Sequence, residues 1–123
     1  MEHMFKSIGV ALASLVFALG LGVSAAAPVA AHPSIDIVAS NWKFTPGTVT
    51  AHLNEPTTLR LTSSGGVHGI QSDELGIPST TIMPGKFVTV TFTPKKLGTY
   101  QVHCAVFCGA GHADMVLVVK VVQ

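Results

Sequence analysis

The sequence has little charge of either sign. Lysine and arginine number seven, aspartate and glutamate number six, and together they make up 11% of 123 residues, with a formal net charge of +1. Soluble domains carry about a quarter charged residues. This small and even balance gives no basis for a nucleic-acid partner or for electrostatic binding to a membrane surface, since both need a basic patch. It also leaves too few carboxylates for a charge-driven disordered tail.

Apolar residues are unevenly distributed. They make up 21 of the first 31 residues (68%) but 38 of the remaining 92 (41%). Lys6 supplies a positive charge, an apolar run follows over 8–21, and small residues accumulate up to Ala31. This order is typical of a secretory signal peptide, cleaved after Ala31 or after Ala25. The alternative is a retained anchor, because residues 8–27 could just span a bilayer.

We therefore predict two parts. Residues 1–31 form an N-terminal apolar signal or anchor helix, and residues 32–123 form a domain outside the cytoplasm, periplasmic if the leader is cleaved. Membrane attachment, with the domain facing the periplasm, is expected only if the N-terminal segment is retained.

The domain over 32–123 is rich in β-branched residues, with 12 valines, 12 threonines and 5 isoleucines. Turn signals containing proline and glycine separate short runs with a period of two, such as 49–53 and 88–92. Helical periodicity is missing from every window. The pattern predicts an all-β sandwich or barrel, small enough to gain stability from a metal or a disulfide.

The two cysteines of the chain begin a compact motif. Cys104 and Cys108 start the pattern C-x3-C-x3-H-x2-M, which ends at His112 and Met115, and His68 follows a serine- and glycine-rich turn far upstream. Two thiolates, two imidazoles and a thioether form a soft donor set that selects copper, with zinc as the main competitor. The motif lies on a glycine-containing loop between two strands, so it could wrap an ion.

This set of residues resembles the dinuclear copper A domain of cytochrome c oxidase subunit II, a cupredoxin family also shared with nitrous oxide reductase. Beyond the ligand loop, the resemblance covers Asn-Trp-Lys-Phe at 41–44, the segment 61–69, Leu-Gly-Ile at 75–77 and Met-Pro-Gly at 83–85. It implies a cupredoxin-like Greek-key β-sandwich that holds two copper ions.

The resemblance also implies the ligands. Cys104 and Cys108 would bridge the two ions as thiolates. His68 and His112 would bind one copper each. The remaining two ligands would be the thioether of Met115, which binds weakly, and the backbone carbonyl of Val106. In the family the position of Val106 usually holds a glutamate, so the carbonyl is kept here and the carboxylate is lost.

The implied function is one-electron transfer, with a c-type cytochrome or an oxidase core subunit as the redox partner. The ligand set offers no obvious open position for a substrate, so the chain is not expected to be catalytic alone. Trp42 is either the point where electrons enter or a tryptophan of the core or its rim. His103 is a spare ligand, a tuning group or, as we favour, a surface histidine that strand alternation turns away from Cys104.

Three other interpretations use the same residues. The cysteines could form a structural disulfide, which leaves His68, His112 and Met115 unexplained. A mononuclear copper electron carrier needs only one of the two cysteines. A periplasmic copper-binding or delivery protein could use the whole set to hold copper reversibly.

Overall fold

A computed structural model describes residues 20–26 and 32–123 of the chain. The helix expected over 1–31 falls mostly outside these residues, and the described stretch 20–26 carries no regular secondary structure. Within the described ranges, no helix is both long and apolar enough to cross a membrane.

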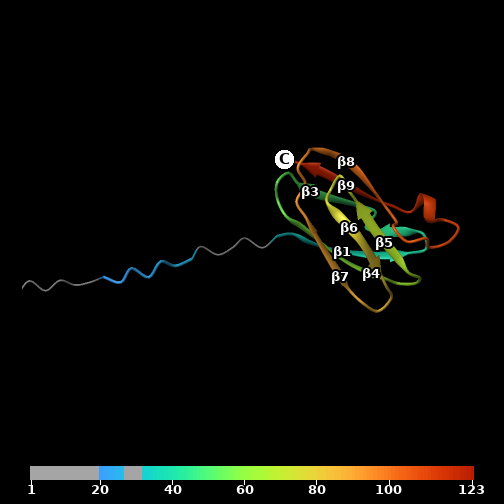
Figure 1. Cartoon of the computed structure of the whole chain (residues 1–123), viewed down its shortest axis with the longest axis horizontal. Coiled ribbons are helices and arrows are strands. Elements are labelled where there is room, and N and C mark those ends of the chain that lie inside the picture. The colour runs from blue at the N-terminus through green and yellow to red at the C-terminus, as the bar shows by residue number, and fades with distance from the viewer. Residues whose placement is uncertain (1–19, 27–31) are drawn as a thin grey trace, which may run out of the picture.

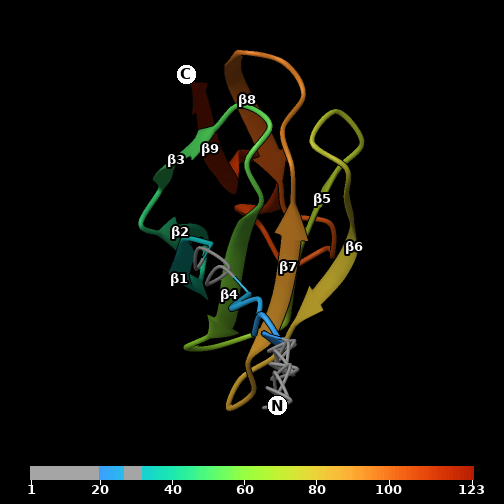
Figure 2. The same cartoon turned by 90° about the vertical axis from the view of Figure 1, so that its left-hand side faces the viewer.

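Two β-sheets packed face to face form the domain (Figures 1 and 2). One sheet has four strands in the order β2-β1-β4-β7 and the other has five in the order β3-β9-β8-β5-β6. The strands of the described chain are β1 Ser34–Ser40, β2 Lys43–Thr45, β3 Thr48–His52, β4 Thr57–Ser63, β5 His68–Ser72, β6 Ile77–Ile82, β7 Val88–Phe92, β8 Gly98–His103 and β9 Val116–Val122. The predicted all-β sandwich is confirmed.

The topology combines hairpin neighbours with long crossovers. β1 pairs in parallel with β4, and β3 pairs in parallel with β9, while the other paired strands run antiparallel. In β3, β4, β7 and β9 alternate residues face the space between the sheets, as the period of two predicts. In β4, Leu59 and Leu61 are fully buried, whereas Arg60 and Thr62, which follow them in alternation, are only half-buried. This core holds the two sheets together.

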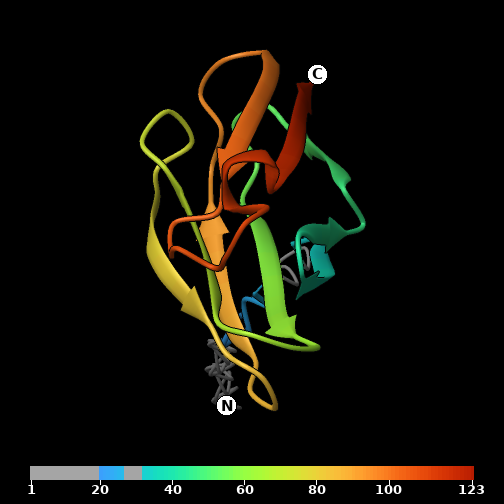
Figure 3. The same ribbon diagram turned by 90° about the vertical axis from the view of Figure 1, so that its right-hand side faces the viewer.

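The loop between β8 and β9 lies at the end of the sandwich opposite the C-terminus, at the right in Figure 1. It contains a single turn of 3₁₀ helix, η1, over His112–Asp114. Figure 3 faces this end and shows the orange and red loop in front of the strands. Because β5 runs antiparallel to β8, with Gln71 opposite His103, the first residues of β5 lie beside this loop.

Candidate metal centre

Backbone hydrogen bonds anchor the loop that carries the cysteine motif. The N–H of Cys104 donates to the carbonyl of Met115 at 3.1 Å, which closes the base of the loop. The N–H of Ala105 donates to the carbonyl of Gly69 at 3.1 Å, which ties the loop to β5. At the end of η1, the N–H of Met115 donates to the carbonyl of His112 at 3.2 Å. These bonds bring the two ends of the motif together.

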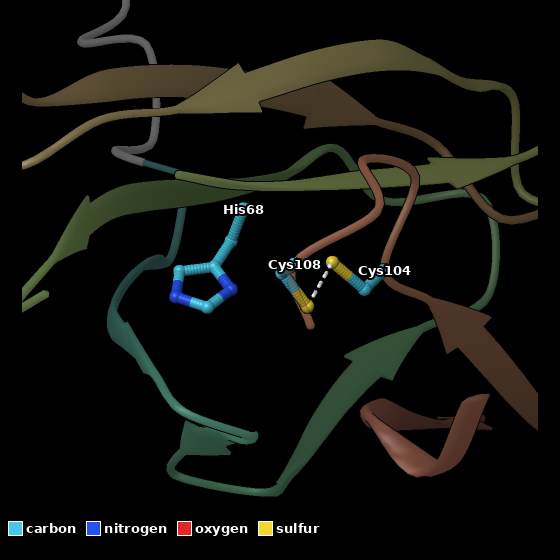
Figure 4. A group of neighbouring side chains, drawn as sticks. All are labelled: His68, Cys104 and Cys108. Atoms are coloured by element: carbon cyan, nitrogen blue, oxygen red, sulfur yellow. Dashed lines mark hydrogen bonds between the residues drawn. The ribbon is translucent and has the colours of Figure 1, made fainter. Parts of the chain in front are cut away.

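The soft donors of the motif form one cluster. The sulfur of Cys108 lies 3.6 Å from that of Cys104, 3.6 Å from Nδ1 of His112 and 3.7 Å from the sulfur of Met115. Both cysteines are free thiols. The donor atoms of His68, Cys104 and Cys108 all lie within 4.8 Å of one another, and Figure 4 shows the imidazole beside the cysteine pair.

His68 is the first residue of β5 and is fully buried. Its Nε2 lies 2.8 Å from the carbonyl oxygen of Gly65, so this nitrogen donates a hydrogen bond. Its Nδ1 is buried and has no hydrogen-bond partner in the described part of the chain. In Figure 4 this ring nitrogen is on the side of Cys108. A buried nitrogen without a partner is costly, and a metal ion bound among these donors would satisfy it.

Val106 also faces the cluster through its main chain. The thiol of Cys104 donates to the carbonyl oxygen of Val106 at 3.1 Å. The side chain packs elsewhere, because a Cβ added at Gly69 would lie 2.9 Å from Cγ2 of Val106. The structure therefore brings all the residues of the proposed ligand set together at one place.

Trp42, in the link between β1 and β2, covers the outside of the loop. Its indole N–H donates to the carbonyl of Cys108 at 2.9 Å. The ring lies so close to Gly111 that an added Cβ there would come within 2.5 Å of it. Trp42 remains 42% exposed, so it touches both the ligand loop and solvent.

His103 does not join the cluster. It is the last residue of β8 and is exposed, while its neighbours Val102 and Cys104 are buried. Strand alternation therefore directs it away from Cys104, as the favoured interpretation expects.

Sequence reasoning missed the polar support behind His68. The residues at 63–66 predict a turn, but they do not predict its contacts. The hydroxyl of Ser63 contacts the backbone of Gly65 and Gly66, and the carbonyl of Gly65 holds His68. The sequence pattern that could have indicated this support is the run Ser-Ser-Gly-Gly at 63–66, at the end of a strand and just before the candidate ligand His68.

Burial raises the pKa of the Cys108 thiol from 9.0 to about 11, with further contributions from the hydrogen bond and the charge of Cys104. Without a metal, this thiol is protonated at neutral pH. Binding of a metal at the cysteine pair must therefore displace protons, which makes metal affinity depend on pH.

Comparison with known proteins identifies the family. Residues 11–119 match the cupredoxin-like domain, and the chain belongs to that family. Over 82 residues it is 27% identical to cytochrome c oxidase subunit 2 of Thermus thermophilus, a match that covers 67% of this chain and 60% of that relative. A second subunit 2 sequence from the same species matches at the same identity over 48% of its length. The chain thus spans about half the length of the curated relatives it matches.

Solved structures share the fold. The periplasmic domain of subunit II of cytochrome oxidase from Bradyrhizobium japonicum superposes with a TM-score of 0.68 at 17% identity, covering 77% of this chain and 87% of that one. Subunit II of cytochrome c oxidase in a mixed disulfide with a thioredoxin-like protein gives 0.63 at 17% identity, covering 80% and 87%. The expected cupredoxin-like architecture is confirmed.

The donor set fits copper. Thiolate, imidazole and thioether ligands are the combination that copper sites of cupredoxins use. The Nδ1 of His68, which is buried and has no hydrogen-bond partner among residues 20–26 and 32–123, points toward the same place. Family and donor chemistry therefore agree on a copper-binding domain.

Proposed function

We propose that this chain carries single electrons at a dinuclear copper centre of the copper A type, as in cytochrome c oxidase subunit II. The observation that carries the proposal is the cysteine pair, with its two sulfurs 3.6 Å apart inside a shell of two imidazoles and a thioether. A mononuclear site would leave one of these two thiols without a role.

The ligands would be His68, Cys104, Cys108, His112 and Met115, with the backbone carbonyl of Val106. Held by these residues, a pair of copper ions would supply one-electron chemistry in which the charge change is shared between two metals, so that little would rearrange. The protein holds its donors on a loop that is pinned at both ends by backbone hydrogen bonds. A rigid donor set keeps the rearrangement small, which favours fast transfer.

The redox partner would dock at the end of the domain that carries the loop. Three large apolar side chains around the donors are exposed there, namely Trp42 (42%), Val67 (40%) and Phe107 (80%). Apolar exposure of this kind supports a transient protein contact. A c-type cytochrome or an oxidase core subunit is the proposed partner, because the curated relatives are oxidase subunits.

A thioredoxin-like dithiol would prepare the site. If Cys104 and Cys108 oxidise to a disulfide outside the cytoplasm, the dithiol reduces it to two thiols and is itself oxidised to a disulfide, with no other electron donor needed. The mixed disulfide of a related fold with a thioredoxin-like protein supports this step. The proposed location is the periplasm, or the periplasmic face of the membrane if the N-terminal segment is retained.

The proposal is tested on the domain after its cysteines have been reduced to thiols and copper has been added. The measurements are the number of coppers bound per chain and the EPR spectrum. We expect two coppers per chain and a hyperfine pattern with more lines than one copper gives, because two nuclei share the electron. Cys104→Ser and Cys108→Ser should each abolish this pattern. His103→Ala is the matched control and should leave it intact, since His103 is exposed and outside the cluster.

Other results would redirect the assignment. One copper per chain in the wild type would exclude the dinuclear centre and support a mononuclear carrier. Slow electron exchange combined with ready release of copper to a chelator would support a copper-delivery protein.

A further inference from the structure

Ser63 carries a buried hydroxyl at the end of β4, where it is 6% exposed. Its Oγ accepts a hydrogen bond from the N–H of Gly65 at 3.1 Å. The same Oγ lies 2.6 Å from the carbonyl oxygen of Gly66 and 3.0 Å from that of Gly65. A hydroxyl has one proton to donate, so it serves one of these carbonyls at a time. Ser63 therefore fastens the turn that leads to β5.

The same turn holds His68 from behind. The carbonyl oxygen of Gly65 is 2.8 Å from Nε2 of His68. Because a carbonyl can only accept, Nε2 carries a proton, so in the neutral imidazole Nδ1 is the nitrogen with the lone pair. In Figure 4 this nitrogen is on the side of the cysteines. The orientation of one backbone carbonyl thus selects the tautomer able to bind metal.

The two glycines of the turn cannot fix that carbonyl themselves. Gly66 has a φ of +76°, and a Cβ there would lie 3.3 Å from Nε2 of His68. Glycine leaves room for the imidazole, but it also gives the backbone wide conformational freedom. The backbone of Gly65 must be held from outside the pair, and the hydroxyl of Ser63 contacts both its N–H and its carbonyl oxygen.

We propose that Ser63 is a positioning residue for His68. By holding the backbone of Gly65, whose carbonyl accepts from Nε2 of His68, it fixes the Nε2-protonated tautomer and directs Nδ1 at the cysteine pair. Its consequence for copper rests on the proposed function, whereas the tautomer is a property of the metal-free protein. Partners that orient a metal-binding imidazole are typically worth roughly 10–100-fold in metal affinity.

The test is ¹⁵N NMR of the histidine ring nitrogens in the reduced, metal-free protein at neutral pH. In the wild type we expect the proton of His68 on Nε2 alone. In Ser63→Ala we expect both tautomers and a copper dissociation constant raised by about tenfold. Ser63→Thr keeps the hydroxyl and should restore both properties. Ser64→Ala is the matched control, because the hydroxyl of this exposed neighbour is directed at the carbonyl of Ala39, 3.5 Å away.

Several results would overturn the proposal. The first is a wild-type His68 that carries its proton on Nδ1. Because this result comes from the wild type, the proposal can be tested even if the Ser63→Ala protein does not fold. Unchanged tautomer and copper affinity in Ser63→Ala would also overturn it. So would equal changes in Ser64→Ala, which would indicate general loosening of the turn. A single copper per chain would refute the dinuclear centre but not the NMR result.

Discussion

The main chain and the side chain of Val106 point in different directions. Its carbonyl oxygen accepts from the thiol of Cys104 at 3.1 Å, while its Cγ2 packs over Gly69. The side chain holds no donor atom, so the backbone is the part of this residue that a metal could use.

Val106→Ala should therefore retain copper. We expect an unchanged copper content and EPR spectrum, and a fall of about 1 kcal/mol in the free energy of unfolding from the lost methyl groups. Metal analysis and urea unfolding measure the two effects. Val116→Ala removes the same groups from a half-buried position on β9 and serves as the control. Loss of copper by a normally folded Val106→Ala protein would show that the carbonyl is not its contribution.

Gly111 is required because Trp42 occupies the space that a side chain would need. An added Cβ would lie 2.5 Å from the indole ring. In Gly111→Ala we expect the partly exposed ring to swing outward, losing its 2.9 Å bond to the carbonyl of Cys108 at a cost of about 1 kcal/mol. Trp42 is the one tryptophan of the chain, so a red shift of the fluorescence of the metal-free protein reports the movement.

The control for this prediction is Ala110→Ser, which changes an exposed neighbour on the same loop. It should leave the emission unchanged. An unshifted spectrum in Gly111→Ala would mean that the loop, rather than the indole, gives way.

At the scale of elements, local patterns predicted strands well. The alternating runs 49–53 and 88–92 correspond to β3 and β7 within one residue. The continuously apolar run of β9 is typical of a central strand, and β9 lies inside its sheet, between β3 and β8. These features depend on residues that are close together in the chain, so the sequence contains them directly.

Other features depend on pairs of residues that no local pattern connects. The parallel pairing of β1 with β4 and of β3 with β9 arises from packing of the whole sandwich. The bond between Trp42 and Cys108 joins residues 66 positions apart. The motif indicated which residues could bind a metal, but the contacts that orient them, such as Ser63 behind His68, required the fold.

Gly69 shows how closely the elements approach one another around the site. It lies on β5 between β6 and the ligand loop, where an added Cβ would come within 2.9 Å of both the carbonyl oxygen of Thr80 and the side chain of Val106. A backbone carbonyl cannot rotate away. Gly69→Ala should therefore separate β5 from β6 or from the loop.

We expect this overpacking to lower the free energy of unfolding by about 1–3 kcal/mol and to weaken copper binding. Thermal unfolding and copper titration measure the two effects together. Gly47→Ala is the matched control, because its added Cβ would meet ordinary contact, 3.5 Å from the carbonyl of Phe44. If Gly69→Ala were as stable as this control, the close approach of the elements would be refuted.

At the scale of the whole molecule, the site depends on both sheets. The donors come from the second sheet, with His68 at the start of β5 and the others on the loop between β8 and β9. The first sheet supports them, because Trp42, between β1 and β2, binds the loop, and Ser63, at the end of β4, contacts the turn before His68. The donors are thus brought together only when the sandwich has formed. Copper binding and folding are therefore thermodynamically linked. Protonation of the thiols affects both the copper affinity and the free energy of unfolding.

The metal-free protein should accordingly lose stability at alkaline pH. Burial, aided by Cys104, raises the pKa of Cys108 from 9.0 to about 11 in the folded state. The folded protein thus favours the protonated thiol more strongly than the unfolded chain does. This contribution to the free energy of unfolding is complete below about pH 8.5 and is lost as the pH rises toward 11.

We expect the urea midpoint of the reduced, metal-free wild type to fall between pH 9 and 11 more steeply than that of Cys108→Ser, which lacks this titrating thiol. Parallel pH profiles would show that burial of the Cys108 thiol does not favour its protonated form.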